Sequence, residues 1–110
     1  MSLHIQARGF PLTRALENSV RTNLLDILER YREVMLLDVR LEDINSNQHG
    51  GIDKRCQVVL TLPNAPSVVI RSTQTDMYLA IKHCASRLKH TMSRYSQRKP
   101  RRHVKADFIP

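Results

Sequence analysis

Basic side chains are concentrated in the last third of this 110-residue chain, where they are placed to bind a polyanion. Residues 1–76 contain nine Lys and Arg and nine Asp and Glu, so their charges cancel. Residues 77–110 contain nine Lys and Arg and a single acid, Asp107, and therefore carry the whole formal net charge of +8. Lys and Arg bind phosphate oxygens through charge-assisted hydrogen bonds. We expect phosphate contacts from Lys82, Arg87, Lys89, His90, Arg94, Arg98, Lys99, Arg101 and Arg102.

Two histidines in the same segment offer a second kind of chemistry, the acid–base catalysis of RNA cleavage. His83 and His90 are seven residues apart, so on a helix they project to the same side. A catalytic pair would need a carboxylate from elsewhere in the chain to orient it. We therefore predict that the protein is not an enzyme and that these histidines contact solvent or phosphate. A small RNA-processing enzyme is the alternative.

Cysteine and glycine positions argue against a metal site or a phosphate-binding loop. Cys56 and Cys84 are 28 residues apart, which is neither a metal-ligand spacing nor a disulfide framework and suits a reducing cytosol. We predict that both are small core residues rather than nucleophiles. Gly50-Gly51 is not followed by the Lys-Ser/Thr of a P-loop. The sequence thus predicts no metal, no cofactor and no small-molecule substrate.

The elements that position these residues follow from hydrophobic periodicity. Apolar and polar residues alternate in three segments, and a weaker fourth segment follows a Pro-Asn-Ala-Pro turn. Alternation is typical of half-buried strands. Gly and Asn between residues 44 and 53 predict a flexible loop. The predicted strands cover residues 3–8, 37–42, 55–60 and 67–73.

Two segments have the spacing of amphipathic helices. In the first, apolar residues recur every three or four positions, which predicts a helix capped by Thr13 and ending near Arg32. The second begins after Asp76, a suitable cap, and loses its pattern from Ser96 onward, which predicts a fraying end and a mobile basic tail. The apolar seam of this last helix consists of Ile81, Ala85, Leu88, Met92 and Tyr95.

The element order β-α-β-β-β-α predicts an α+β fold with two helices packed on one face of a four-stranded mixed sheet. A right-handed crossover makes the first two strands parallel, and the last three form an antiparallel meander. We expect residues 1–96 to form this domain and residues 97–110 to form a basic flexible C-terminal tail.

The exposed side of the last helix favours RNA as the partner. An ordinary surface helix carries Glu–Lys pairs, whereas no carboxylate occurs from Met77 to Ala106. The apolar side of this helix is needed for the core and the segment lacks Trp, which disfavours a membrane surface. No DNA-binding signature is present, and helices on a sheet suit recognition of RNA shape and phosphates. Generic binding to structured RNA is an alternative, and a solvated helix of skewed charge is another.

Two arginines of the first helix are further candidates for phosphate contacts. Arg14 and Arg21 are seven residues apart and therefore lie on one flank of that helix. They extend the basic surface if this flank faces the last helix.

Several short motifs match one known family. The stretch Asp76-Met77-Tyr78-Leu79-Ala80-Ile81 opens the last helix, and the basic run from Arg87 to Arg94 follows it. Leu12-Thr13 with Ala15-Leu16 opens the first helix, and Pro63-Asn64 lies in the turn before the fourth strand. Together with the element order and the chain length, residues 1–98 resemble the ribosome hibernation factors, a family that includes hibernation promoting factor, ribosome-associated inhibitor A and protein Y.

The resemblance implies a short-form factor that binds the small ribosomal subunit. Such factors occupy the mRNA and tRNA path in the decoding cleft and inhibit translation in stationary phase or stress. Their basic helix side chains contact rRNA phosphates, and Arg87, Arg94 and Arg98 match family cations by position. His90 stands where the family often has Arg, and Lys82 replaces an acid or amide. The resemblance leaves open whether the protein promotes or opposes ribosome dimerisation, and we favour simple inactivation.

We expect no targeting signal at the N-terminus. Residues 1–8 contain no basic segment followed by an apolar one, so neither a secretory signal nor a transit peptide is expected. The longest apolar runs are far shorter than the roughly 20 residues of a membrane span. We expect a cytoplasmic protein of bacterial type, a monomer, with rRNA as its partner and no membrane.

Overall fold

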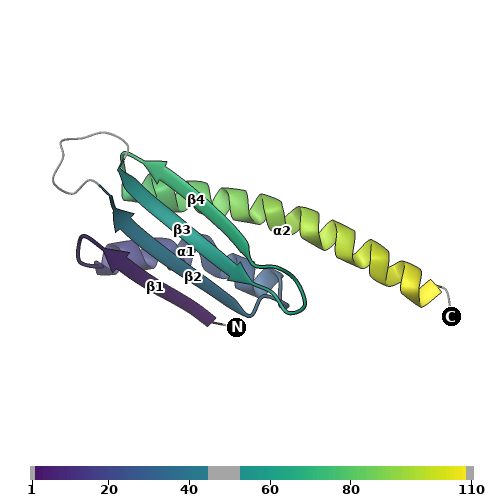
Figure 1. Cartoon of the computed structure of the whole chain (residues 1–110). Coiled ribbons are helices and arrows are strands. Elements are labelled where there is room, and N and C mark those ends of the chain that lie inside the picture. The colour runs from purple at the N-terminus through teal and green to yellow at the C-terminus, as the bar shows by residue number, and fades with distance from the viewer. Residues whose placement is uncertain (1, 45–52, 109–110) are drawn as a thin grey trace.

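Four strands and two helices form the chain in the predicted order β-α-β-β-β-α (Figure 1). The computed structural model describes the backbone of residues 2–44 and 53–108, and side chains as far as Tyr95. The predicted loop over 44–53 lies almost entirely outside the described residues. The elements are β1 (Ser2–Arg8), α1 (Arg14–Arg30), β2 (Leu36–Asp43), β3 (Lys54–Thr61), β4 (Val68–Gln74) and α2 (Met77–Phe108).

The sheet has the predicted mixed topology. Its four strands lie in the order β1-β2-β3-β4, so that β1 and β4 are the two edges. β1 pairs with β2 in parallel, and the β2–β3 and β3–β4 pairs are antiparallel. The register aligns Ile5 with Val39, Val39 with Val58, and Val58 with Ile70. This apolar row crosses the whole sheet and, because side chains alternate along a strand, faces the helices.

Both helices cover the same face of the sheet, as predicted (Figure 1). α2 packs on β3 and β4 and also against α1. Its seam residues Ile81, Ala85, Leu88 and Met92 are at most 3% exposed. Each buried side chain of this size contributes roughly 1.5–3 kcal/mol, apart from the smaller Ala85, before conformational entropy is subtracted. The orientation of α2 is therefore set by its apolar side.

α1 begins where the sequence predicts and ends slightly earlier. The Thr13 hydroxyl accepts a hydrogen bond from the backbone N–H of Leu16 at 3.1 Å, which confirms the predicted cap. The helix ends at Arg30 instead of Arg32 because Tyr31 leaves the helical conformation, with φ −116° and ψ 87°. Its carbonyl accepts a hydrogen bond from Val34 at 3.1 Å, and both side chains are buried.

α2 is longer than predicted, since the helix continues from Met77 to Phe108 instead of fraying near Ser96 (Figure 1). The apolar pattern ends at Tyr95. Such a pattern shows which residues pack against a core and does not show where the helical backbone ends. Gln97, Arg98, Lys99, Arg101 and Arg102 have good helix propensity, and the helix continues through Pro100 although Pro disfavours a helix interior. Mobility of residues 97–110 stays a prediction.

Both cysteines lie in the core between the sheet and α2. Cys56 of β3 and Cys84 of α2 are completely buried, and the Cys84 Sγ donates a hydrogen bond to the carbonyl oxygen of Cys56 at 3.0 Å. The neighbouring Cys84 thiol and, as a smaller cause, burial both raise the pKa of the Cys56 thiol. The predicted role of both residues as small core side chains agrees with this burial.

We expect both thiols to be unreactive in the folded protein at neutral pH. A disulfide reagent such as Ellman's attacks only an accessible thiolate, and burial removes the access. Titration should therefore detect no reactive thiol in the native protein within minutes, and both thiols after addition of denaturant. Rapid modification of either cysteine without denaturant would contradict the packing of α2 on β3.

Candidate nucleic-acid interface

The side of α2 opposite the buried seam carries the basic residues. At about 100° per residue, these residues spread over the half of the helix that faces away from the sheet. All are exposed except Lys89, which is half-buried. We call this the cationic face of α2, and its described residues are Lys82, His83, Arg87, Lys89, His90 and Arg94.

The two flanks of the cationic face meet different neighbours. On the outer flank, which consists of Arg87 and Arg94, the Arg87 Nη1 donates a hydrogen bond to the carbonyl oxygen of Arg71 in β4 at 2.6 Å. On the inner flank, which consists of Lys82 and Lys89, the Lys89 Nζ lies 3.9 Å from a carboxylate oxygen of α1. The cationic face therefore extends from the β4 edge of the sheet to the neighbouring helix.

That carboxylate belongs to Asp26, whose contact with Lys89 no pattern within either helix predicts. The absence of acids holds along α2 but not in space, because α1 places one carboxylate beside Lys89. Both side chains are about half exposed, at 43% and 56%. Such a pair contributes about 0–1 kcal/mol, so it does not prevent the ammonium from binding a phosphate. Within the described residues, no carboxylate lies within ion-pair distance of Lys82, Arg87 or Arg94.

Arg14 and Arg21 are not brought to the cationic face. Asp26 marks the flank of α1 that meets α2. Arg14 and Arg21 are displaced from Asp26 by roughly 120–140° around the helix. Arg21 instead forms an ion pair with Glu17 at 3.2 Å. The flank that carries these arginines therefore does not face α2, and their contact with RNA stays a prediction.

The four remaining candidates lie near the end of α2. Figure 1 shows this part of the helix projecting beyond the sheet. Its backbone continues the cationic face in the same helix, and the side chains lie outside the described residues. The candidates concerned are Arg98, Lys99, Arg101 and Arg102.

The two histidines are exposed but lack the partners of an acid–base pair. The His83 Nδ1 lies 2.9 Å from the Gln74 Nε2. This contact ties the exposed imidazole to a side chain of β4 and not to a carboxylate. Among the described side chains, no carboxylate lies within ion-pair distance of His83 or His90. The described residues therefore do not assemble a histidine–carboxylate pair for RNA cleavage.

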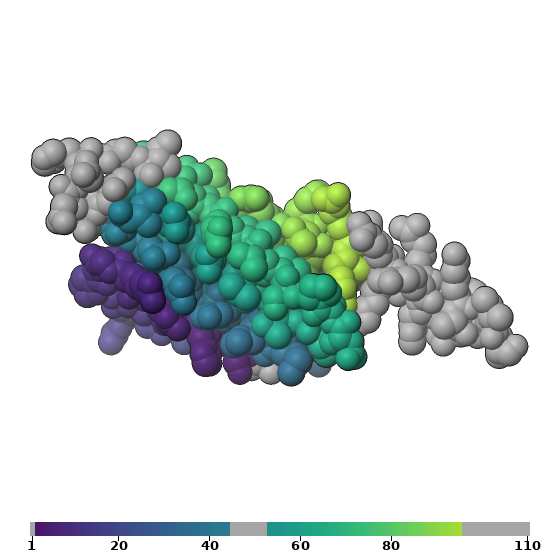
Figure 2. All heavy atoms as spheres, viewed as in Figure 1, coloured from purple at the N-terminus to yellow at the C-terminus, as the bar shows by residue number. Residues whose placement is uncertain are grey.

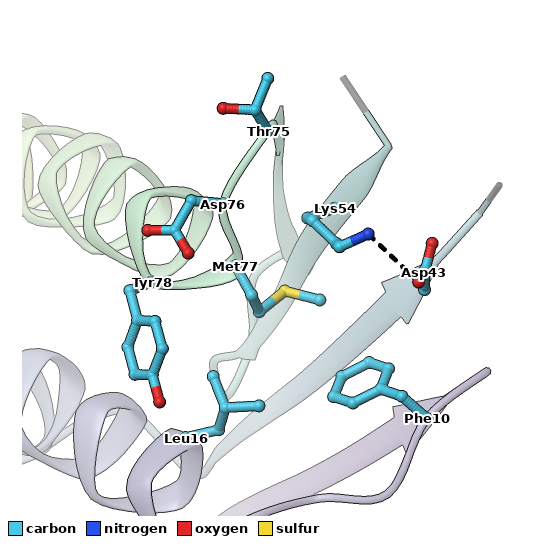
Figure 3. Close-up of a pocket in the computed structure, with 8 residues that line it drawn as sticks. All are labelled: Phe10, Leu16, Asp43, Lys54, Thr75, Asp76, Met77 and Tyr78. Atoms are coloured by element: carbon cyan, nitrogen blue, oxygen red, sulfur yellow. Dashed lines mark hydrogen bonds and ion pairs between the residues drawn. The ribbon is translucent and has the colours of Figure 1, made fainter. Parts of the chain in front are cut away.

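A cavity of about 270 Å³ lies at the N-terminal end of α2 (Figure 3). Its walls are mostly apolar and include Phe10 and Tyr78. The Lys54 Nζ at its rim lies 3.1 Å from carboxylate oxygens of both Asp43 and Asp53. Hydrogen bonds to Asp53 and then to Asp43 raise the pKa of Lys54, so its ammonium stays charged and is not a base. Lys54 thus ties the ends of β2 and β3 together.

Neither a metal centre nor a membrane span is found in the described part of the chain. No three His, Cys, Asp or Glu side chains are grouped there so as to hold a metal ion. Neither α1 nor α2, as far as described, combines the length and apolar character needed to cross a membrane. The cationic face of α2 is accordingly the feature that carries the functional interpretation.

Comparison with known proteins points to one family. A family model described as sigma 54 modulation protein / S30EA ribosomal protein matches residues 3–99. No curated protein matches the chain.

Two solved structures share the fold. A ribosomal subunit interface protein from Coxiella burnetii aligns with a TM-score of 0.73 and 18% identity, over 88% of this chain and 99% of that one. The N-terminal domain of Protein Y from Thermus thermophilus aligns with a TM-score of 0.68 and 22% identity, over 86% and 99% of the two chains. At these identities the likeness shows a common fold.

Proposed function

The chain belongs to the sigma 54 modulation protein / S30EA ribosomal protein family, and we propose that it is a non-catalytic ribosome hibernation factor. In this proposal the cationic face of α2 binds rRNA of the small ribosomal subunit in the decoding cleft. The bound protein occupies the path of mRNA and tRNA and so inhibits translation in stationary phase or stress. In this proposal the protein acts in the cytoplasm and as a monomer.

The observation that carries the proposal is the exposed cationic face on a helix whose other side is buried. Four seam residues that are at most 3% exposed, Ile81, Ala85, Leu88 and Met92, hold α2 on the sheet, so the basic side chains project from a rigid support. The α2 segment within the family match, residues 77–99, contains six Lys and Arg and no acid. A rigid array of cations binds closely spaced phosphates with little loss of conformational entropy.

The fold supports ribosomal RNA rather than another polyanion. The family description names a ribosomal protein, and one of the two solved structures, which matches over nearly its whole length, is named a ribosomal subunit interface protein. Folded RNA is recognised mainly through its shape and its phosphates, which a ridge of Lys and Arg contacts without reading bases. Inhibition then needs only steric occupation of the decoding cleft.

Co-sedimentation with purified ribosomal subunits tests the proposal. We expect the protein to pellet with small subunits in preference to large subunits and to a generic RNA duplex. If the six Lys and Arg of residues 77–99 each neutralise one phosphate, the logarithm of affinity should fall with the logarithm of salt concentration with a slope of roughly −4 to −5.

Assays of RNA binding, RNA cleavage and translation separate the alternatives. Similar affinity for any structured RNA would favour a generic RNA-binding protein and overturn the assignment to the small subunit. Cleavage of rRNA or mRNA that survives stringent purification and disappears in His90→Ala would favour a small RNA-processing enzyme. Inhibition of a reconstituted translation reaction, relieved by excess small subunits, is the functional result we expect.

A further inference from the structure

The cationic face of α2 is joined directly to the edge of the sheet. The Arg87 guanidinium donates to the carbonyl oxygen of Arg71 at 2.6 Å, and Arg71 lies in the edge strand β4. The carbonyl groups along an edge strand can accept hydrogen bonds from an added strand. Here one of them accepts a hydrogen bond from the Arg87 side chain instead. The contact joins the Arg87 guanidinium to the backbone of β4 at the point where the helix layer meets the sheet layer.

The side chain of Arg71 lies on the open face of the sheet, opposite the helices. Residues alternate between the two faces along a strand, and the neighbours of Arg71 in β4, Ile70 and Ser72, are buried under the helices. The register places Arg71 beside Gln57, Gln57 beside Arg40, and Arg40 beside Gln6. This row, which we call the Arg40–Arg71 row, crosses all four strands without an acidic residue.

Arg71 is held in place within that row. Its Nε donates a hydrogen bond to the Gln57 Oε1 at 2.6 Å, which leaves the two Nη groups as donors toward solvent. Arg71 itself is exposed and Arg40 is half-buried. Among the described residues, neither has a carboxylate within ion-pair distance. A guanidinium that is already oriented loses less entropy when it binds a phosphate.

The rest of the open face is also basic on balance. The adjacent row pairs Arg55 with Glu42, whose side chains lie 3.7 Å apart. Figure 2 views the molecule from this face and shows α2 emerging beside β4, so that both are visible from one direction. The charged residues of the face are Arg8, Arg40, Arg55 and Arg71 against Asp38 and Glu42.

We propose that the RNA-binding surface continues from α2 around the β4 edge onto the open face of the sheet, where Arg71 and Arg40 bind backbone phosphates of a second rRNA segment. The proposal rests on the proposed function and adds a contact that lies outside both helices. The protein would then be held between RNA on its helical layer and RNA along its β4 edge.

Composition indicates contacts with phosphates rather than with bases. Sheets that read single-stranded RNA do so by stacking bases on aromatic side chains. The four strands of this sheet contain no Phe, Tyr or Trp. The Arg40–Arg71 row offers only guanidinium and amide groups, which match phosphate and ribose oxygens.

Removal of single charges from the open face tests the proposal. We expect Arg71→Gln to weaken binding to small subunits roughly fivefold at 0.15 M salt and to make the salt slope less steep by about 0.7–0.9, the effect of one lost phosphate contact. Arg40→Gln combined with Arg71→Gln should weaken binding roughly 25-fold. Arg55→Gln is the control for net charge on the same face, because Arg55 is less exposed than Arg71 and lies outside the Arg40–Arg71 row, and it should change binding less than twofold.

The outcomes separate this inference from the proposed function. Unchanged binding of Arg71→Gln, with loss of binding when α2 is altered, would overturn the sheet contact and leave the proposed function standing. Weaker binding with an unchanged salt slope would also overturn it, since the contact would then not be with phosphate. Unchanged binding in both sets of variants would overturn the sheet contact and the proposed function together. Identical melting temperatures of the three arginine variants exclude a folding defect.

Discussion

Reversal of two charges on α2, Lys82→Glu together with Arg94→Glu, is expected to abolish association with small ribosomal subunits. Lys82 lies on the inner flank of the cationic face and Arg94 on the outer flank, and both are exposed. Two lost phosphate contacts alone weaken binding roughly 25-fold at 0.15 M salt, and repulsion between the new carboxylates and phosphates adds to this loss. We expect a total loss above about 100-fold, measured by co-sedimentation across a salt series.

The choice of these two residues follows from the contacts of the others. Arg87 and Lys89 already engage Arg71 and Asp26, so their replacement would also disturb the β4 edge or the contact between helices. Lys82 and Arg94 touch no described carboxylate, and we expect the double variant to melt at the same temperature as the parent. Normal sedimentation of a folded double variant would show that α2 is not the contact surface.

Arg14→Glu with Arg21→Glu is the matched comparison, because it changes the net charge of the protein by the same amount. These arginines lie on the flank of α1 that does not meet α2, as the position of Asp26 shows. Binding close to that of the parent would show that the loss in the α2 variant depends on position and not on net charge. A comparable loss would extend the RNA-binding surface to the far flank of α1.

Truncation of the seam, Leu88→Ala, is expected to lower the free energy of unfolding by about 2–5 kcal/mol. Leu88 is completely buried between α2 and the sheet, so the substitution leaves a cavity that its neighbours fill only partly. This loss is a large fraction of the roughly 5–15 kcal/mol that stabilises a typical domain. Urea unfolding monitored by circular dichroism measures it directly.

Leu79→Ala supplies the control within the same helix. Leu79 is 39% exposed, and its side chain projects on the same side of α2 as the cationic face. The same chemical change there should cost less than about 1 kcal/mol, because little packing is lost. Equal destabilisation by the two substitutions would contradict the assignment of Leu88 to the core and of Leu79 to the surface.

One helix thus links stability to binding in this protein. The apolar side of α2 fixes its rotation about its own axis, and that rotation decides where every basic residue of the opposite side points. A substitution in the seam would therefore affect RNA binding through the orientation of α2, even if the cationic residues are unchanged. A substitution such as Lys82→Glu would affect binding without affecting the seam.

Local patterns in the sequence were sufficient for most of the fold. Alternation located the four strands, and the spacing of three and four residues located both helices and their buried sides. The Thr13 cap and the burial of Leu88 follow from residue type and position alone, because both depend on interactions within or beside one element. The grouping of basic residues on the exposed side of α2 follows from the same periodicity.

Other features were decided only by the tertiary structure. Asp26 lies beside Lys89 and Arg71 beside Arg87 because two elements pack at a particular rotation and offset, which no local pattern encodes. The same packing turns Arg14 and Arg21 away from α2. The end of α2 was misjudged because apolar periodicity reports burial, whereas helix continuation past Tyr95 depends on backbone propensity. Sequence therefore determined which side of each element is apolar or charged, and the tertiary structure determined which charges meet.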